Sequence, residues 1–298
     1  MANLRAIRTR IKSVESTRQI TKSMKMVAAA KLRKTQAAFA DLKHFAELSG
    51  ELLEEAVQGS PLGDENPYLH PHTDSNCVCY VLVLGNRGLC GTYNQALLRC
   101  CDKLIRESDR ENYLIVCGRW GKDLIAASGL CVRESFEISD TPDRSEAEAL
   151  TERLKQLYSE KTVDEIVLVY QRYRSVLVQT PESQPLLPLR RDGTELRDGE
   201  PEPAEAESDL IFEPNRESIV NTLLDLYIGN TVHAVLLEAR TGEHSARMTA
   251  MTAATDNTEE LLGDLTLELN HARQAAITTE ITEIASGAEA LRNSIAGG

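Results

Sequence analysis

Apolar residues recur with helical spacing at both ends of the chain. After Pro214, the last proline, nothing interrupts a helix from Arg216 to Ile295. The final part of this stretch has apolar or small residues at alternating steps of four and three, the heptad pattern of a helix that lies against another helix. These positions are Ile277, Ile281, Ile284, Ala288, Leu291 and Ile295. At about 1.5 Å per residue the stretch would be roughly 120 Å long, more than a compact domain can contain, so we expect it to protrude.

A second apolar stripe begins at the N-terminus, where residues 1–59 also contain no proline. It starts at Leu4, Ile7, Ile11 and Val14, after which its spacing slips as at a coiled-coil stutter. It continues through Ile20, Met24, Val27, Leu32, Phe39, Leu42, Phe45, Leu48 and Leu52. The simplest arrangement pairs the two terminal helices as an antiparallel coiled coil. The alternative is two ordinary amphipathic helices of a bundle.

Between the terminal helices, strand and helix patterns alternate. Cys77–Leu84 is a nearly continuous apolar run, typical of a parallel strand covered on both faces. Further strands are expected over Tyr113–Gly118, Cys131–Phe136, Ile166–Tyr173 and Val176–Thr180, and helices from the turn at Gly85–Gly91 to Glu107, over Trp120–Ser128 and over Glu146–Tyr158. This alternation predicts a small Rossmann-like α/β domain with a largely parallel sheet.

Prolines and charges mark the boundaries between these segments. We expect an N-terminal coiled-coil helix (1–59), an α/β domain (77–182), an acidic, proline-rich loop (183–214) and a C-terminal coiled-coil helix (215–298). The loop contains the acidic tract Glu200–Glu207, and the stretch Asp198–Ser208 is too charged and too rich in proline to form a core.

Composition narrows the possible functions. The net charge of −13 over 298 residues argues against general nucleic-acid binding. Met1–Lys34 nevertheless carries ten basic residues against Glu15 alone, which indicates either a solvated helix face or a collar for acidic protein partners. Seven cysteines, three of them in apolar strand-like runs, indicate reduced, buried thiols. No apolar run approaches the length of a membrane span, so we expect a soluble or peripheral protein.

Two candidate sites lie in the turn Gly85–Gly91, with the sequence GNRGLCG. A phosphate could meet backbone N–H groups there, at a helix N-terminus. The turn lacks the G-x-G-x-x-G pattern and the lysine of a P-loop, so a tight structural turn is favoured. Cys90 could be a nucleophile if a histidine reached it, but a structural cysteine is the simpler interpretation.

Two further groups are weaker candidates. His70, His72, Cys77 and Cys79 could supply four metal ligands, but the cysteines lie in an apolar strand at a spacing that zinc sites seldom use. The carboxylates along the terminal helix could suggest acid–base chemistry but are expected to be solvated; they are Glu280, Glu283 and Glu289. The sequence therefore predicts no catalytic, cofactor or metal site.

Several separated segments resemble the gamma subunit of F-type ATP synthases, in the right order along the chain. They are Ala2–Gln36, Gly85–Asn94 (GNRGLCGTYN), Ala246–Asn257 (ARMTAMTAATDN) and Leu265–Leu291. The family's signature positions fall on Arg87, Gly88, Leu89, Cys90, Gly91, Thr278, Glu280, Glu283, Gly287 and Ala288. The chain departs from the family where Gly85-Asn86 replaces a common Ser-Asp and Thr92 a common Gly. Pro181–Pro214 also lacks the cysteine pair of redox-regulated chloroplast versions, which puts thiol control in doubt.

This resemblance implies a non-catalytic rotary shaft. The terminal helices would turn inside a ring of three alpha and three beta subunits, where ATP is handled on beta. The α/β domain would lie near the epsilon subunit and the membrane rotor ring of c subunits, at the cytoplasmic face of a bacterial membrane. By the resemblance, contacts with beta map to Met24, Lys25, Arg273 and Gln274. Two alternatives are a thiol-dependent α/β hydrolase that uses Cys90, with the helices as a dimerisation arm, and a free-standing coiled-coil adaptor.

Overall fold

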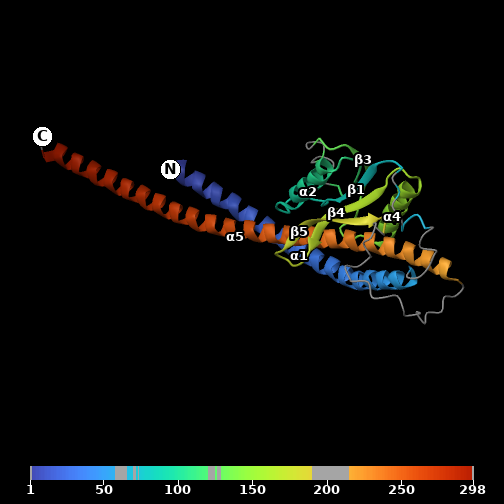
Figure 1. Cartoon of the computed structure of the whole chain (residues 1–298). Coiled ribbons are helices and arrows are strands. Elements are labelled where there is room, and N and C mark those ends of the chain that lie inside the picture. The colour runs from blue at the N-terminus through green and yellow to red at the C-terminus, as the bar shows by residue number, and fades with distance from the viewer. Residues whose placement is uncertain are drawn as a thin grey trace. The chain divides into compact units, whose positions relative to one another are not determined.

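The structure is a computed structural model that describes residues 2–57, 66–69, 72, 74–119, 125, 129–189 and 215–296. Its elements, all but β2 labelled in Figure 1, are α1 (Ala2–Val57), β1 (Cys77–Val83), α2 (Tyr93–Glu107), β2 (Glu111–Cys117), β3 (Val132–Phe136), α4 (Arg144–Ser159), β4 (Glu165–Tyr173), β5 (Gln179–Leu187) and α5 (Arg216–Ala296). The chain divides into two compact parts. We call Ala28–Thr249 the sheet part, and Met1–Val27 with Ala250–Gly298 the helix-pair part.

The sheet part contains one five-stranded sheet in the order β3-β2-β1-β4-β5. β1 pairs in parallel with β2 and β4, and β2 pairs in parallel with β3. Only β5 runs antiparallel, against β4. The prediction of an α/β fold with a largely parallel sheet is therefore confirmed.

Both faces of the sheet are covered. On the central strand β1, Cys79 and Val81 belong to a core shared with α4 and the first half of α5, whereas Tyr80 and Leu82 belong to a core shared with α2. All seven residues of β1 are buried, as its apolar run predicted. Each fully buried aliphatic side chain contributes about 1.5–3 kcal/mol relative to an exposed one, so this strand anchors the sheet.

The strand expected at Val176–Thr180 is misplaced. Residues 174–178 form the turn that joins β4 to β5, and β5 runs from Gln179 to Leu187. Pro181 and Pro185 suggested a loop, because proline cannot donate a ladder hydrogen bond. They are tolerated here because β5 is an edge strand, where only one side of the strand is paired.

The other element boundaries lie close to their predicted positions. α4 begins at Arg144 because the Asp143 side chain caps it, accepting a hydrogen bond from the Glu146 N–H at 2.9 Å. The helix expected over Trp120–Ser128 lies outside the described residues except for Ile125, which is buried in the core beneath α2.

The two terminal helices run antiparallel. In the sheet part, Arg216 Nε donates to the Ala56 carbonyl at 3.0 Å, and Tyr227 lies against Gly50. In the helix-pair part, the hydroxyls of Thr21 and Thr255 lie 2.9 Å apart, and Arg18 lies 3.9 Å from Glu259. In each part, residues later in α1 contact residues earlier in α5, which is the predicted antiparallel pairing.

The stutter expected in α1 is wrong. One series of buried positions falls at multiples of seven residues, and several of its members are small or hydroxyl-bearing: Ile7, Thr21, Ala28, Thr35, Ser49 and Ala56; Leu32, Leu53 and Val57 are buried as well. Apolar residues assigned to the stripe, such as Ile20 and Val27, are instead 57% and 55% exposed. The buried hydroxyls are satisfied within the helix, since Thr35 Oγ1 donates to the Lys31 carbonyl and Ser49 Oγ to that of Ala46. A stripe read from large apolar residues alone therefore included the buried Ile7 and Leu32 but missed the small and hydroxyl-bearing members of the seam.

The predicted seam near the end of α5 does not pack on α1. Because Thr21 contacts Thr255 and the helices run antiparallel, the start of α1 at Ala2 lies level with about Gln274 of α5. Ile277, Ile281 and Ile284 lie beyond that point and are 45%, 61% and 73% exposed. In the helix-pair part α5 instead buries Met251, Thr255 and Leu265. Leu291 and Ile295 lie among the side chains that the structure does not describe.

One helix, α5, contains a stretch long and apolar enough, by length and composition, to cross a membrane. This differs from the expectation that no such run exists. Its buried members include Ile228 and Val232, which pack in the core of the sheet part. A helix that covers a sheet also has an apolar face, and 33% of this stretch is buried in the structure.

Gly118 provides a test of the packing at the carboxyl end of β2. Its φ is +117°, and a Cβ at this position would lie 2.4 Å from the Leu84 carbonyl oxygen. We expect Gly118→Ala to lower the free energy of unfolding by about 3 kcal/mol or more, because backbone and not a flexible side chain must move. Urea unfolding of the full chain measures this effect. Gly229→Ala is the control, since a Cβ there meets nothing within 4 Å and a helical Gly→Ala change should stabilise by about 0.5–1 kcal/mol. Equal midpoints for both variants would contradict the packing.

Candidate functional site

The glycine-containing turn after β1 holds a carboxylate of the chain itself. The backbone N–H groups of Asn86 and Arg87 donate to Glu243 Oε1 at 3.1 and 3.3 Å. Gly85 leaves room for this contact, because a Cβ there would lie 3.0 Å from the Glu243 carboxyl carbon. Asn94, in the first turn of α2, holds the other side of the turn by accepting from the Gly85 N–H at 2.9 Å.

Two arginines of α5 complete the surroundings of Glu243. Arg240 Nη1 lies 2.8 Å from Oε2 and Arg247 Nη2 lies 2.6 Å from Oε1. The three residues share one helix face because they are three and four positions apart. Their side chains are 1%, 1% and 9% exposed, so this is a buried ion cluster.

The arginines also tie α5 to the loops at the carboxyl edge of the sheet. Arg240 uses all five of its N–H groups, and besides Glu243 it donates to the carbonyls of Leu84, Ile138 and Ser139 and to Asn86 Oδ1. Arg247 donates to the carbonyls of Arg87 and Gly88. A buried ion pair stabilises a fold only when its remaining donors and acceptors are also satisfied, and Arg240 meets that condition.

Electrostatics keep Glu243 ionised. Burial by itself raises the pKa of a carboxyl, but the charges of Arg240 and Arg247 outweigh it and hold the pKa of Glu243 below its usual value. In doubly wound sheets ligands bind at the carboxyl ends of the strands, where the strand order reverses. Here that position is between β1 and β4, and the N–H groups that could face a phosphate already face Glu243. The turn is structural, which the sequence favoured.

A second polar contact joins α1 to the same edge. Lys31 Nζ pairs with Asp140 in the loop after β3, and Asn86 Nδ2 donates to Asp140 Oδ1 at 3.2 Å. Partial burial would raise the pKa of Asp140, but the hydrogen bonds from Lys31 and Asn86 lower it. His244 Nε2 lies 3.1 Å from the Asp140 carbonyl. The turn, the loop after β3, α1 and α5 therefore meet at one polar centre within the sheet part.

The surroundings of Cys90 do not activate its thiol as a nucleophile. It is 3% exposed, its Sγ donates to the Arg87 carbonyl at 3.6 Å, and it accepts from Asn94 Nδ2 at 3.7 Å. Burial raises the pKa of the Cys90 thiol, and the charge of Arg247 only partly opposes this. Since the thiolate is the reactive form, the hydrolase alternative lacks its activated cysteine.

The other candidates also take structural places. Cys77 and Cys79 are buried in the core beneath α4, and His72 Nδ1 lies 3.2 Å from Asp164 Oδ1. His70 lies outside the described residues, and among those described no three His, Cys, Asp or Glu side chains gather as metal ligands. Glu280 and Glu283 are exposed on α5; the side chain of Glu289 is outside the described set.

The proposed partner residues lie in the helix-pair part. Arg273 and Gln274 are exposed near the point where α1 runs out, whereas Met24 and Lys25 are half-buried on α1. The Thr21–Thr255 contact places Lys25 level with about Met251, so roughly 30 Å of helix separates it from Arg273. The two pairs are therefore separate patches. The signature residues Thr278, Glu280, Glu283, Gly287 and Ala288 are all exposed, and in the sheet part Arg87, Leu89 and Gly91 are exposed while Cys90 is buried.

Sequence reasoning missed Arg240, Glu243 and Arg247. A signal was present, because opposite charges three and four residues apart interrupt an apolar helix. Exposed helices usually carry such pairs in solvent, so the pattern alone does not indicate burial. These three charged side chains are buried only because the sheet packs over this face of α5.

Comparisons with known proteins agree with this architecture. A family model described as ATP synthase matches residues 3–291. The chain is 40% identical to an ATP synthase gamma chain of Halothermothrix orenii over 98% of its own length and 100% of that relative, and 40% identical to one of Moorella thermoacetica with the same coverage. Among solved structures it resembles a chain of the Euglena gracilis mitochondrial ATP synthase rotor, with a TM-score of 0.63 and 19% identity over 93% of this chain and 99% of that one.

Glu243→Gln tests the buried ion cluster. We expect a loss of about 3–5 kcal/mol in the free energy of unfolding near neutral pH, because two buried arginines lose their counter-charge. The matched control is Glu148→Gln, which breaks an exposed pair with Arg144 at 2.7 Å and should cost about 0–1 kcal/mol.

Comparing the native chain with the Glu243→Gln variant also tests how the free energy of unfolding depends on pH. Glu243 has a lower pKa when folded, so its ionised form stabilises the fold above the pKa of the unfolded carboxyl. That contribution is lost as the pH falls below about 4.5 and through the folded-state pKa. The stability gap between the native chain and Glu243→Gln should therefore narrow on acidification, as followed by urea unfolding at several pH values. A difference in the free energy of unfolding that stays constant with pH would contradict the view that ionised Glu243 stabilises the fold.

Cys90 labelling tests the structural cysteine. With iodoacetamide under native conditions, we expect Cys90 to react about a hundredfold more slowly than Cys131, because Cys90 is buried with a raised pKa and Cys131 is exposed. Mass spectrometry of the two peptides gives both rates in one sample. Faster labelling at Cys90 would restore the thiol-enzyme hypothesis.

Proposed function

The chain belongs to the family of ATP synthase gamma chains, and we propose that it is the central shaft of an F-type ATP synthase. In this role it couples proton flow through a membrane rotor to ATP synthesis or hydrolysis on the beta subunits. It supplies no catalytic group of its own. The family assignment rests on the match over almost the whole chain and on relatives 40% identical along their full length.

The observation that carries this function is the end of α5. Beyond the point where α1 runs out, α5 exposes Ile277, Ile281 and Ile284 on one face. Apolar side chains at heptad spacing need a cover, and the described part of this chain provides none there. A sleeve of surrounding subunits would supply it. Small residues at Gly287 and Ala288 suit a bearing, because they offer little for such a sleeve to grip.

The strength of individual contacts limits how such a shaft can work. Each additional ~1.4 kcal/mol of binding in one orientation slows escape from it about tenfold. A shaft therefore needs few orientation-specific contacts and many weak ones. We assign the specific contacts with beta to Arg273 and Gln274, with Met24 and Lys25 as a second, separate patch. Arginine suits this role because its planar fork can bind a carboxylate in two places.

The buried ion cluster suits a shaft that carries torque. Arg240, Glu243 and Arg247 join α5 to the loops of the sheet, so a twist applied to one would be transmitted to the other. We assign the α/β domain (77–182) to the foot of the shaft, beside the epsilon subunit and the ring of c subunits. The helices 1–59 and 215–298 form the coiled coil. Of the segment expected to be an acidic loop (183–214), residues 183–187 belong to β5 instead, and positions 190–214 lie outside the described residues.

The complex would be membrane-bound and this chain peripheral to it, at the cytoplasmic face of a bacterial membrane. Co-expression with the alpha and beta subunits of the same organism tests the proposal. We expect a stable complex in which ATP hydrolysis drives rotation of a probe fixed to Cys131, an exposed cysteine. A chain that remains free of alpha and beta would favour the adaptor alternative.

The double substitution Arg273→Ala with Gln274→Ala tests the proposed contacts. We expect the assembled complex to persist and its ATP turnover to fall several-fold, because a charged hydrogen bond of about 1.5–3 kcal/mol is enough to bias one rotational state. The measurement is the ATPase rate of purified, intact complex. The matched control is Gln95→Ala with Arg99→Ala, which removes an exposed Gln and Arg from α2 and should leave the rate unchanged. Equal rates in all three complexes would remove these residues from the mechanism.

A further inference from the structure

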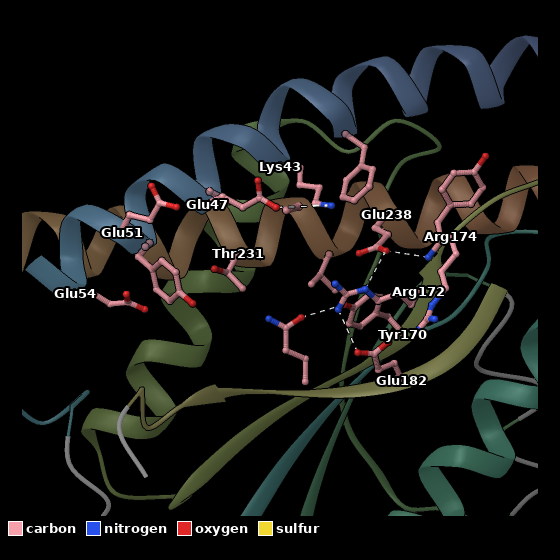
Figure 2. Close-up of a pocket in the computed structure, with 18 residues that line it drawn as sticks. Lys43, Glu47, Glu51, Glu54, Tyr170, Arg172, Arg174, Glu182, Thr231 and Glu238 are labelled. Carbon is pink, nitrogen blue, oxygen red and sulfur yellow. Dashed lines mark hydrogen bonds and ion pairs between the residues drawn. The ribbon is translucent and has the colours of Figure 1, made fainter. Parts of the chain in front are cut away.

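A cavity of about 770 Å³ lies in the sheet part between α1, α5 and the β4–β5 hairpin. Figure 2 shows α1 above it and the sheet below, with Glu238 of α5 pointing into the space between them. Its lining contains the aromatic side chains Phe39, Tyr170, Tyr173 and Tyr227. Its lining includes none of the residues of the ion cluster or of the proposed contacts with beta, so the proposed shaft function does not account for the cavity.

The floor of the cavity is a buried carboxylate with spare acceptor capacity. Glu238 is 6% exposed and accepts one hydrogen bond, from the Tyr173 N–H at 2.9 Å. Arg172 approaches only to 3.9 Å and is engaged with Glu182 at 3.2 Å. A carboxylate offers about four acceptor positions, so most of those on Glu238 remain open. Burial raises the pKa of Glu238, which a bound cation would reverse.

The remaining charges of the cavity also favour a cation. Its lining carries five carboxylates, Glu47, Glu51, Glu54, Glu182 and Glu238, against three basic residues, Lys43, Arg172 and Arg174. Three of the carboxylates follow one another along α1 and span about 10 Å of helix. The lining also includes the rings of Phe39, Tyr170, Tyr173 and Tyr227, and aromatic faces attract organic cations. A compact metal ion would use the carboxylates but not the rings.

We propose that this cavity binds a linear polyamine, with one ammonium group on Glu238 and another on the carboxylates of α1. The short alkyl spacers of such a molecule would lie against the tyrosine rings. Lys43 acts as an internal competitor, because its Nζ lies 3.7 Å from Glu47 at the mouth of the cavity. A polyamine must displace this contact to reach Glu47.

Calorimetric titration of the full chain with spermidine, at fixed ionic strength and neutral pH, tests the site. We expect one saturable site per chain, and about tenfold weaker binding in Glu238→Gln, because the amide keeps the hydrogen bond from Tyr173 but loses the charge. Should that variant fail to fold, Glu47→Gln on the exposed surface of α1 should weaken binding several-fold.

The chain contains a matched control for the α1 residues. Lys103 and Glu107 on α2 form an exposed pair with the same spacing and the same 3.7 Å separation as Lys43 and Glu47. Lys43→Ala should strengthen spermidine binding several-fold and Lys103→Ala should leave it unchanged. No saturable binding, or equal effects at the two pairs, would overturn the proposal. If the chain bound Mg²⁺ as tightly as spermidine, the proposal would also be overturned, because attraction between charges would then explain the binding without the aromatic side chains.

Discussion

The placement of one carboxylate, Glu243, decides how the sheet part is held together. A buried charge is expensive unless it is paired, and Glu243 obtains its partners from two arginines of α5 and from the N–H groups of the turn after β1. Those arginines in turn require the carbonyls at Leu84, Ser139 and Gly88. None of these charged side chains can be buried at low cost unless its partners are buried with it. The helix, the turn and the loop after β3 therefore fold as one unit.

This arrangement changes the role of the fold's usual ligand-binding edge. In a doubly wound sheet the carboxyl ends of the strands commonly receive a phosphate. Here a side chain from a helix far along the sequence lies against the turn, and Gly85 is the residue that allows it to approach. The edge becomes a joint between sheet and helix. A joint of buried, paired charges is stiff, which suits the shaft function that we propose for this chain.

The pairing of the terminal helices follows a different principle. Its buried positions include Thr21, Ala28, Thr35 and Ser49, whose small size permits close approach and whose hydroxyls bond to their own helix backbone. Larger apolar residues such as Ile20 and Met26 face outward, and so do Ile281 and Ile284 on α5. A chain that worked alone would gain by burying them. Their exposure is consistent with a helix pair whose outer surface meets other subunits.

The sequence by itself determined what depends on local pattern. Proline-free ends predicted α1 and α5, the apolar run at Cys77–Leu84 predicted a central parallel strand, and the signature residues predicted the family. The tertiary structure decided what depends on neighbours. Pro181 and Pro185 are compatible with β5 only because that strand lies at an edge. The seam of α1 uses Thr and Ser because the partner helix comes close. Arg240, Glu243 and Arg247 form a joint only because the sheet covers them; the same spacing on a solvated helix would give a weak surface pair, and sequence spacing does not distinguish the two environments.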